Sequence, residues 1–413
     1  MKMNKKNLFM SSVFALLLLF TAMGSSCSKG GKKLSDREVL VKIYDALNIK
    51  KNVPKEKFEN WNTDRPIGEW EGVECNAEGR VTKLELSGDS LYGAIPAEIG
   101  QLTELEQLEI QLHCYEGVQN SCPAEVFQLN KLKELSISIP NSDDVAGSKI
   151  PEKIDLPVIE ELDLVGFDGP IDGLCKLTTL TSLEIVDLNA VIPDAIGNLV
   201  NLTNLNISSS YDAKGSVPES IGKLKNLKQL TIDYSQFFGS VKGASGKIPA
   251  SIWGLTNLER LFLRKAADAP SSIPADKVAM MTNLESIVIC NSALTGQIPK
   301  ELFASKKLCE VALYDNPELT GPIPDEICDC LDMSSINFNR NNLTGTIPAK
   351  IGNLKKLTML WLEGNKQLTG TIPAGIGGLD KLLNFGLEDT QVSRNVPEAV
   401  KANKNFSSWN LWN

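Results

Sequence analysis

Apolar residues return along the chain in the pattern Leu-x-x-Leu-x-Leu, mostly at intervals of 24 or 25 residues. The last two apolar positions of each copy alternate with outward positions, which predicts a short strand with one buried face. The copies begin at Val81, Leu105, Leu132, Ile159, Leu180, Leu202, Leu227, Leu258, Leu284, Leu308, Met333, Leu357, Leu382 and Phe406. This register predicts thirteen repeats and a final partial strand from Phe406 to Asn413.

The copy that begins at Leu357 shows what each position does. Leu360 and Leu362 point inward from the strand, so Trp361 between them faces outward. Asn365, just after the strand, can hydrogen-bond the backbone of the next turn. One repeat cannot bury its own apolar side, so the repeats must stack. Thirteen parallel strands spaced about 4.8 Å apart predict a concave sheet about 60 Å long.

The strand is followed by the segment Leu-Thr-Gly-x-Ile-Pro, seen most clearly from Leu368 to Pro373. Together these motifs resemble the plant-type class of leucine-rich repeats, familiar from receptor-kinase ectodomains. The resemblance spans nearly everything from Ser35 to Asn413. It implies an α/β repeat solenoid, a curved or twisted superhelix with a parallel concave sheet. Such a scaffold serves as a platform that binds a protein, a peptide or a glycan.

The residues ahead of the repeats resemble the helical N-terminal cap of the same family. Ser35-x-x-Glu38 reads as a capping box at the start of a helix. A Trp-Glu-Gly-Val-Glu-Cys segment ends the match at Cys75. The family usually has a partner cysteine where this chain has Gly68, which implies that Cys75 lacks the family's cap disulfide. We assign the cap to residues 34–80 and the repeats to residues 81–413.

The asparagine that follows the strand in this repeat class is present only in some copies. Four of the middle copies have another residue there, so we expect their turns to be less regular. The asparagine stands at Asn316, Asn341 and Asn365, and its place is taken by Phe167, Leu188, Ser210 and Ala266.

The N-terminus has the pattern of an export signal. Lysines precede an apolar run from Leu8 to about Met23, and small residues then lead into Cys27. This predicts a signal peptide over residues 1–26. The small residues before the cysteine resemble a bacterial lipobox, which implies a lipid on Cys27 and a membrane anchor. The alternative is ordinary cleavage with Cys27 as a free thiol. Residues 27–33 read as a flexible tether, and the expected location is the bacterial cell envelope, at the outer membrane, facing the periplasm or the surface.

The net charge of −9 argues against a nucleic-acid partner, because an acidic surface repels phosphate backbones. The only histidine is His113, and the chain contains no nucleophile motif, phosphate loop or zinc-ligand spacing. We therefore expect no cofactor, no metal and no enzymatic activity.

Cysteine usage fits an oxidising compartment, with eight cysteines left if Cys27 carries a lipid. Cys114 and Cys122 bracket an added loop in the second repeat, which predicts a disulfide between them. The pairing of the other cysteines stays open: Cys75, Cys175, Cys290, Cys309, Cys328 and Cys330.

The outward strand positions change character along the chain. In the first half they are acidic: Glu85, Glu109, Glu134, Glu161, Asp163 and Glu184. This set has the ordinary explanation of a solvated face. In the second half the predicted ligand-binding residues are large and apolar: Phe262, Val288, Tyr314, Met359 and Trp361. Such residues are enriched at binding surfaces, although a C-terminal strand or tail could instead cover some of them, and Trp409 and Trp412 could cap the core.

These observations predict a non-enzymatic envelope lipoprotein that binds a protein or peptide on its concave or lateral face. Two alternatives remain open. One is a glycan-binding lipoprotein that stacks sugars on the aromatic residues. The other is a structural envelope protein without a discrete ligand.

Overall fold

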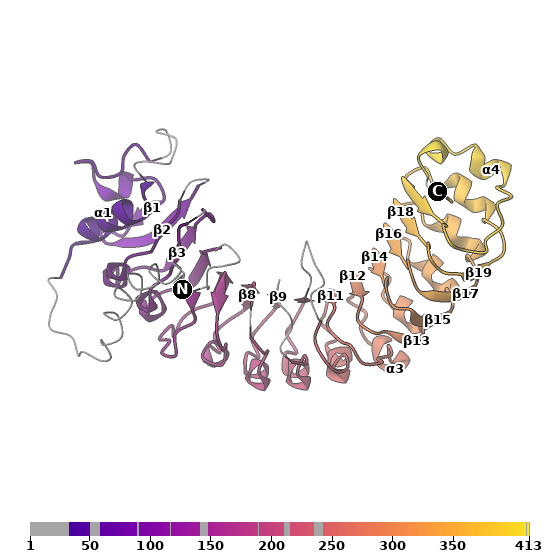
Figure 1. The fold of residues 1–413 in the computed structure, drawn as a ribbon, viewed down its shortest axis with the longest axis horizontal. Coiled ribbons are helices and arrows are strands. Elements are labelled where there is room, and N and C mark those ends of the chain that lie inside the picture. The colour runs from indigo at the N-terminus through magenta and orange to yellow at the C-terminus, as the bar shows by residue number, and fades with distance from the viewer. Residues whose placement is uncertain are drawn as a thin grey trace, which may run out of the picture.

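Thirteen parallel strands lie side by side along the inside of an arc, one strand for each repeat (Figure 1). The computed structural model describes residues 33–49, 58–88, 91–115, 117–140, 148–188, 190–209, 215–234, 243–409 and 411–412. The predicted signal peptide, Cys27 and most of the tether lie outside these residues. The strands are β2 (Val81–Ser87), β3 (Gln107–Gln111), β4 (Glu134–Ser138), β6 (Glu161–Val165), β8 (Ser182–Val186), β9 (Asn204–Ser208), β10 (Gln229–Asp233), β11 (Arg260–Arg264), β12 (Ser286–Cys290), β14 (Glu310–Ala312), β16 (Ser335–Asn337), β18 (Met359–Trp361) and β20 (Asn384–Gly386).

Short helical turns cover the outer side of the arc (Figure 1). An extended proline precedes most of them, such as Pro96 (φ −75°, ψ 145°) and Pro373 (φ −60°, ψ 131°), so the Ile-Pro pair sets the entry to each turn. The 3₁₀ helices are η1 (Ile67–Glu69), η2 (Ala97–Gln101), η3 (Ala124–Gln128), η4 (Leu174–Lys176), η5 (Asp194–Asn198), η6 (Glu219–Lys223), η7 (Ala250–Gly254), η8 (Lys300–Ala304), η9 (Asp325–Asp329), η10 (Ala349–Asn353), η11 (Ala374–Gly378) and η12 (Phe406–Ser408). The α-helices are α1 (Asp36–Ala46), α3 (Ala275–Val278) and α4 (Glu398–Lys401).

The Leu-Thr-Gly segments build a second parallel sheet in the C-terminal half. Its order is β13 (Thr295–Gln297), β15 (Glu318–Pro322), β17 (Asn342–Thr346) and β19 (Gln367–Thr369). A smaller pair, β5 (Ser148–Lys149) and β7 (Phe167–Asp168), lies in the N-terminal half. Gly370, expected to permit a tight bend, has φ +84°, and a Cβ at this position would lie 2.6 Å from a methyl carbon of Thr346. The glycine is therefore required both by its backbone conformation and by the close approach of the preceding repeat.

One continuous hydrophobic core runs from the cap to the last repeat. The alternation predicted for the strands is confirmed, since Leu360 and Leu362 are at most 1% exposed and Trp361 lies on the opposite face. The end of the chain differs from prediction. Among the described residues there, Phe406–Ser408 form η12, and Leu411 O accepts a backbone hydrogen bond from Leu387 N–H (3.0 Å) instead of joining a strand. Trp409, 7% exposed, donates its indole N–H to Leu382 O (2.9 Å) and caps the core.

The asparagine after the strand ties each turn to the one before it. Asn316 is fully buried, and its Oδ1 accepts the N–H groups of Ser292 and Leu294 (both 3.1 Å). Its Nδ2 donates to Ile289 O (2.9 Å) and Leu313 O (3.1 Å). One side chain thus satisfies backbone groups of two repeats that no strand reaches. The prediction that Asn365 contacts the next turn is wrong in direction, because its Oδ1 accepts from Leu343, in the preceding repeat (3.1 Å).

Repeats that lack this asparagine are joined by a second asparagine ladder, near the start of the strand. In each case Nδ2 donates to a backbone carbonyl of the preceding repeat at 2.8 to 3.2 Å. The members are Asn201, Asn226, Asn257 and Asn283. This ladder was not predicted, and it gives the middle repeats a regular connection that the first ladder does not supply.

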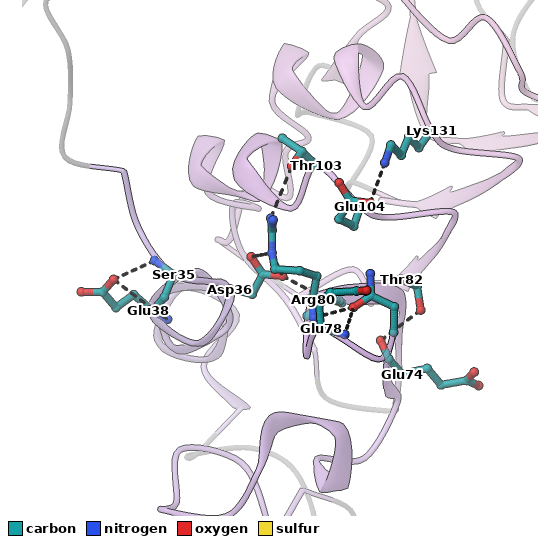
Figure 2. A network of polar contacts seen from close by, with 12 residues as sticks. Ser35, Asp36, Glu38, Glu74, Glu78, Arg80, Thr82, Thr103, Glu104 and Lys131 are labelled. Atoms are coloured by element: carbon teal, nitrogen blue, oxygen red, sulfur yellow. Dashed lines mark hydrogen bonds and ion pairs between the residues drawn. The ribbon is translucent and has the colours of Figure 1, made fainter.

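The N-terminal cap docks on the first repeat through a buried carboxylate (Figure 2). The capping box of Ser35 and Glu38 is present and starts α1. Asp36, 6% exposed, accepts from Val81 N–H (2.8 Å) and from Arg80 Nε (3.0 Å). Arg80 also donates to Thr103 Oγ1 (3.3 Å) at the end of the first repeat. A charge-assisted network therefore fixes the helix to the first strand of the sheet.

The cap keeps the geometry of a disulfide without having one. β1 (Val73–Cys75) pairs antiparallel with β2 and ends at the free thiol of Cys75. A Cβ built on Gly68 would lie 3.8 Å from the Cys75 Cβ, the usual separation in a disulfide. The absence of a partner for Cys75 therefore follows from the glycine and not from a different cap fold.

None of the helices in the described part of the chain has the length and hydropathy needed to cross a bilayer.

We expect Asn316→Ala to lower the free energy of unfolding by at least about 3 kcal/mol, because it leaves several buried backbone groups without partners. Asn257→Ala is the matched control: it removes an asparagine of the second ladder at an exposed site, and should cost about 1 kcal/mol or less. Urea unfolding followed by circular dichroism measures both. Equal losses in the two variants would contradict the account of the buried ladder.

Candidate functional site

The register of the parallel sheet aligns one outward residue from each strand into a single row on the concave face, which we call the central row. Polar and acidic residues occupy its first half and apolar residues much of its second half. The row runs Glu85, Glu109, Ser136, Asp163, Glu184, Asn206, Thr231, Phe262, Val288, Ala312, Asn337, Trp361 and Gly386.

Most of the predicted acidic residues surround a hollow of about 390 Å³ on the N-terminal half of the concave face, which we call the acidic hollow. They belong to two rows, because Glu134 and Glu161 pair with each other beside the central row. Glu85 lies at a neighbouring hollow toward the cap. The charged residues of the acidic hollow are Lys83, Glu109, Glu134, Glu161, Asp163 and Glu184.

Two carboxylates of the hollow face each other on adjacent strands. Asp163 of β6 and Glu184 of β8 are partners in the sheet register, and neither forms an ion pair among the described residues. Ser136 Oγ donates to Asp163 Oδ2 (3.0 Å). Burial raises the pKa of Asp163 despite that hydrogen bond, and burial together with the charge of Asp163 raises the pKa of Glu184. The adjacent negative charges of Asp163 and Glu184 therefore destabilise the folded state.

The carboxylates do not assemble a metal site. Across the described residues, no group of three or more His, Cys, Asp or Glu side chains is placed to hold a metal ion. A calcium ion needs six or more oxygen ligands that converge on one point. The hollow therefore presents a surface of negative charge and not a coordination cage.

A second hydrophobic cluster lies on the solvent side of the sheet, separate from the solenoid core, and we call it the apolar cluster. Val288, Cys290 and Ala312 form its buried floor, with exposures of 7%, 0% and 5%. Phe262 and Tyr314 pack against this floor and remain half-buried. Burial raises the pKa of the Cys290 thiol to about 11, so at neutral pH it is a protonated, apolar group and not a nucleophile.

An arginine borders the apolar cluster on the side of the acidic half. The Arg264 guanidinium lies over the Phe262 ring, 5.1 Å from its centroid. Its Nη2 donates to Asp233 Oδ2 on the neighbouring strand (2.7 Å). The cation is thus held by one carboxylate and one aromatic ring, and it keeps Phe262 in place on the sheet.

The predicted strip of large apolar residues is not continuous. Tyr314 lies two residues beyond Ala312, so it stands past the end of β14 and outside the central row. Asn337 separates Ala312 from Trp361 along the row. Trp361, with Met359 beside it on β18, instead borders a separate hollow of about 300 Å³. The other residues of this hollow are Asn339, Glu363, Asn384, Phe385 and Gly386.

The predicted disulfide between Cys114 and Cys122 is contradicted by the structure, in which both thiols are free. Cys114 is exposed, whereas Cys122 turns toward the core, 3.7 Å from Pro123 O. Asn120 anchors the loop in place of the bond. It is 1% exposed and donates to His113 O (2.9 Å) and Pro140 O (2.8 Å). These carbonyls belong to two turns in which His113 and Pro140 themselves occupy the position of the ladder asparagine.

Comparisons with solved structures decide the fold. A leucine-rich-repeat protein of Leptospira interrogans is 25% identical with a TM-score of 0.56, over 78% of this chain and 76% of that one. The chain folds as a leucine-rich-repeat solenoid. The Arabidopsis receptor kinase HAESA, solved with the peptide hormone IDA and a co-receptor, is 24% identical with a TM-score of 0.57 over 91% of this chain and 73% of that one. An internalin of Listeria monocytogenes is 18% identical with a TM-score of 0.53, over 92% and 98% of the two chains.

Curated relatives match parts of this leucine-rich-repeat chain, and no protein-family profile matches it. Receptor-like protein 6 of Arabidopsis thaliana is 25% identical over 311 residues, 74% of this chain and 24% of that protein. Phytosulfokine receptor 2 of the same plant is 38% identical over 98 residues (23% and 9%). Its polygalacturonase inhibitor 1 is 32% identical over 101 residues (24% and 29%). The chain spans less than a third of these relatives. Receptors and an inhibitor support a binding fold.

We expect the double variant Asp163→Asn and Glu184→Gln to be more stable than the native leucine-rich-repeat solenoid by about 1 kcal/mol at neutral pH. Folding raises both pKa values, so the ionised forms destabilise the fold and protonation relieves this. The gain in stability of the double variant over the native protein should therefore be present at pH 7. It should disappear as the pH falls to about pH 3, because the carboxyl groups of the native protein become protonated over this range. Thermal unfolding from pH 3 to pH 7 tests this, and a destabilised double variant at pH 7 would refute it.

Proposed function

We propose that this leucine-rich-repeat protein is a non-enzymatic binding protein of the cell envelope that captures a protein or peptide on its concave face. The observation that carries the proposal is the apolar cluster. The solenoid buries its leucines on the other side of the sheet, so folding gives no reason to place Phe262, Val288 and Tyr314 toward solvent. Half-buried aromatic residues on a preformed floor are the usual anchors of protein interfaces.

The relatives support binding as the activity. Two of them are by name a receptor and an inhibitor, and both names describe binding of a partner. Within this chain, the buried thiol of Cys290 is protonated at neutral pH, and the carboxylates of the acidic hollow lie on an open surface. A glycosidase would instead need a cleft that holds the scissile bond between two carboxyl groups.

A glycan is the second candidate ligand, and the hollow beside Trp361 favours it. The exposed part of that indole ring faces a space bordered by amide and carboxylate groups from Asn339, Asn384 and Glu363. Sugars combine a stacking face with hydroxyl groups, and an aromatic ring with polar neighbours suits both. A short oligosaccharide could therefore bind at this hollow independently of the apolar cluster.

Tyr314→Ala should weaken capture of a protein or peptide from native envelope extract by about thirtyfold, since truncation of an aromatic anchor typically costs about 2 kcal/mol. Its melting temperature should stay within a few degrees of the native value. Leu331→Ala is the control, because Leu331 is 60% exposed at the turn before β16, away from the central row. If Trp361→Ala rather than Tyr314→Ala abolishes capture and soluble oligosaccharides compete, the glycan reading replaces the protein one.

We propose further that Cys27 carries the lipid that anchors the protein in the bacterial cell envelope, at the outer membrane. The apolar run and the small residues before Cys27 support this. The expected result is a mature N-terminus that begins at Cys27 with a mass increment for diacylglycerol. Intact-mass and N-terminal peptide spectrometry measures it, and an unmodified start at another residue would exclude the anchor. Cys27→Ser should release the protein into the soluble fraction.

A further inference from the structure

We infer that the ligand of the concave face is an extended peptide segment that carries a Lys or Arg side chain and, about four residues away, an aromatic or branched apolar side chain. The basic side chain lies in the acidic hollow and the apolar one on the apolar cluster. This inference rests on the proposed function and adds the chemistry and spacing of the ligand.

The spacing follows from the sheet. The acidic hollow ends at Glu184 of β8, and the apolar cluster begins at Phe262 of β11. Both residues lie in the central row, and β9 and β10 separate their strands. Three strand spacings correspond to about 14 Å. An extended polypeptide covers that distance in about four residues.

The expectation of a cationic group on the ligand follows from a comparison with acidic residues elsewhere on this chain, where lysines pair with them. Immediately before the strands of this sheet, carboxylates are neutralised by the neighbouring repeat, as in Glu106 with Lys133 (2.7 Å) and Glu259 with Lys228 (3.3 Å). In the hollow, Asp163 and Glu184 face each other, and the ion pairs of the described residues do not include them. Lys83, at the edge, pairs with Glu85 (3.3 Å) instead.

A ligand cation would remove the repulsion that the free protein carries. A metal ion does not fit, because the described carboxylates do not converge as a ligand set. A Lys or Arg side chain fits better, because its cationic group lies at the end of a long aliphatic stem and can approach the carboxylates from the open side of the hollow. The open shape of the hollow, about 390 Å³, admits such a side chain from the concave face.

The stretch between the two ends suits a peptide backbone. Asn206 and Thr231 are the central-row residues there, and both are small polar side chains that do not obstruct a chain; the Asn206 amide already hydrogen-bonds Glu184. A polyamine would satisfy the hollow but leave Phe262 and Tyr314 uncovered. A ligand with both chemistries covers the whole stretch.

The test is selection of random 12-residue peptides displayed on phage against the immobilised full-length protein. Enriched peptides should pair Lys or Arg with Trp, Phe, Leu or Met at separations of three to five residues. A synthetic copy of the best peptide then gives affinities by isothermal titration. Replacing its basic residue by norleucine should weaken binding at least tenfold.

Variants assign that loss to the hollow. The unsubstituted selected peptide should bind the double variant Asp163→Asn and Glu184→Gln at least tenfold more weakly than it binds the native protein. On this variant, replacing the basic residue of the peptide by norleucine should weaken binding little further. Asp325→Asn with Glu326→Gln is the matched control, because it removes the same two charges from η9 on the outer side of the arc and should change nothing.

The possible outcomes distinguish failure of this inference about the peptide from failure of the proposed binding function. Enriched peptides that lack a basic residue, or whose binding ignores the Asp163 and Glu184 changes but falls with Tyr314→Ala, overturn this inference and leave the proposed function standing. Binding of spermine alone, with no peptide selected, overturns the inference in favour of a polyamine. Selection of no peptide and capture of no envelope protein overturns both.

Discussion

Each repeat presents a stripe of leucine and isoleucine side chains that only the next repeat can cover, and this requirement organises the whole molecule. Leu360 and Leu362, for example, are almost fully buried although each repeat has fewer than thirty residues on average and no core of its own. Stacking then aligns the strands in parallel, and the backbone groups at each turn must find partners in the neighbouring repeat. Asn316 and its equivalents meet that demand from inside the solenoid.

The same constraint leaves the opposite side of every strand free. Because the core uses one set of alternate positions, the central row can hold residues that do not help the fold. Asp163 and Glu184 oppose it through their adjacent charges, and Phe262 and Tyr314 expose apolar surface to water. Residues that lower the stability of the fold are expected mainly where they serve function, so this surface is the expected binding site.

The sequence predicts the strands, their register and the solenoid well, because the Leu-x-x-Leu-x-Leu spacing reports directly on burial. It predicts less where geometry depends on neighbouring repeats. Tyr314 was placed in the wrong row, since only the structure shows that β14 ends at Ala312. The prediction of a disulfide between Cys114 and Cys122 is wrong because spacing cannot reveal that Cys122 turns toward the core while Cys114 stays exposed.

The turns that follow the strands show the same limit of prediction from the sequence. Several non-glycine residues adopt a left-handed backbone at the position before the ladder asparagine or its replacement, including Lys265 (φ 51°), Asp315 (φ 58°) and Arg340 (φ 51°). Aspartate is a residue type that tolerates this conformation, but nothing in Lys265 or Arg340 signals it, and at those two positions it is enforced by the stacked repeats. The candidate site was therefore predictable as a face of the molecule and as a set of side chains, but not as two separate surfaces divided at Asn337.

Whether the concave face holds the ligand is the central question, and site-specific photo-crosslinking in living cells answers it most directly. A benzophenone amino acid at Thr231, between the acidic hollow and the apolar cluster, should form a discrete covalent adduct with the partner. The same amino acid at Leu331, exposed away from the central row, should form none. An adduct from Leu331 and none from Thr231 would contradict the assignment of the concave face as the binding surface.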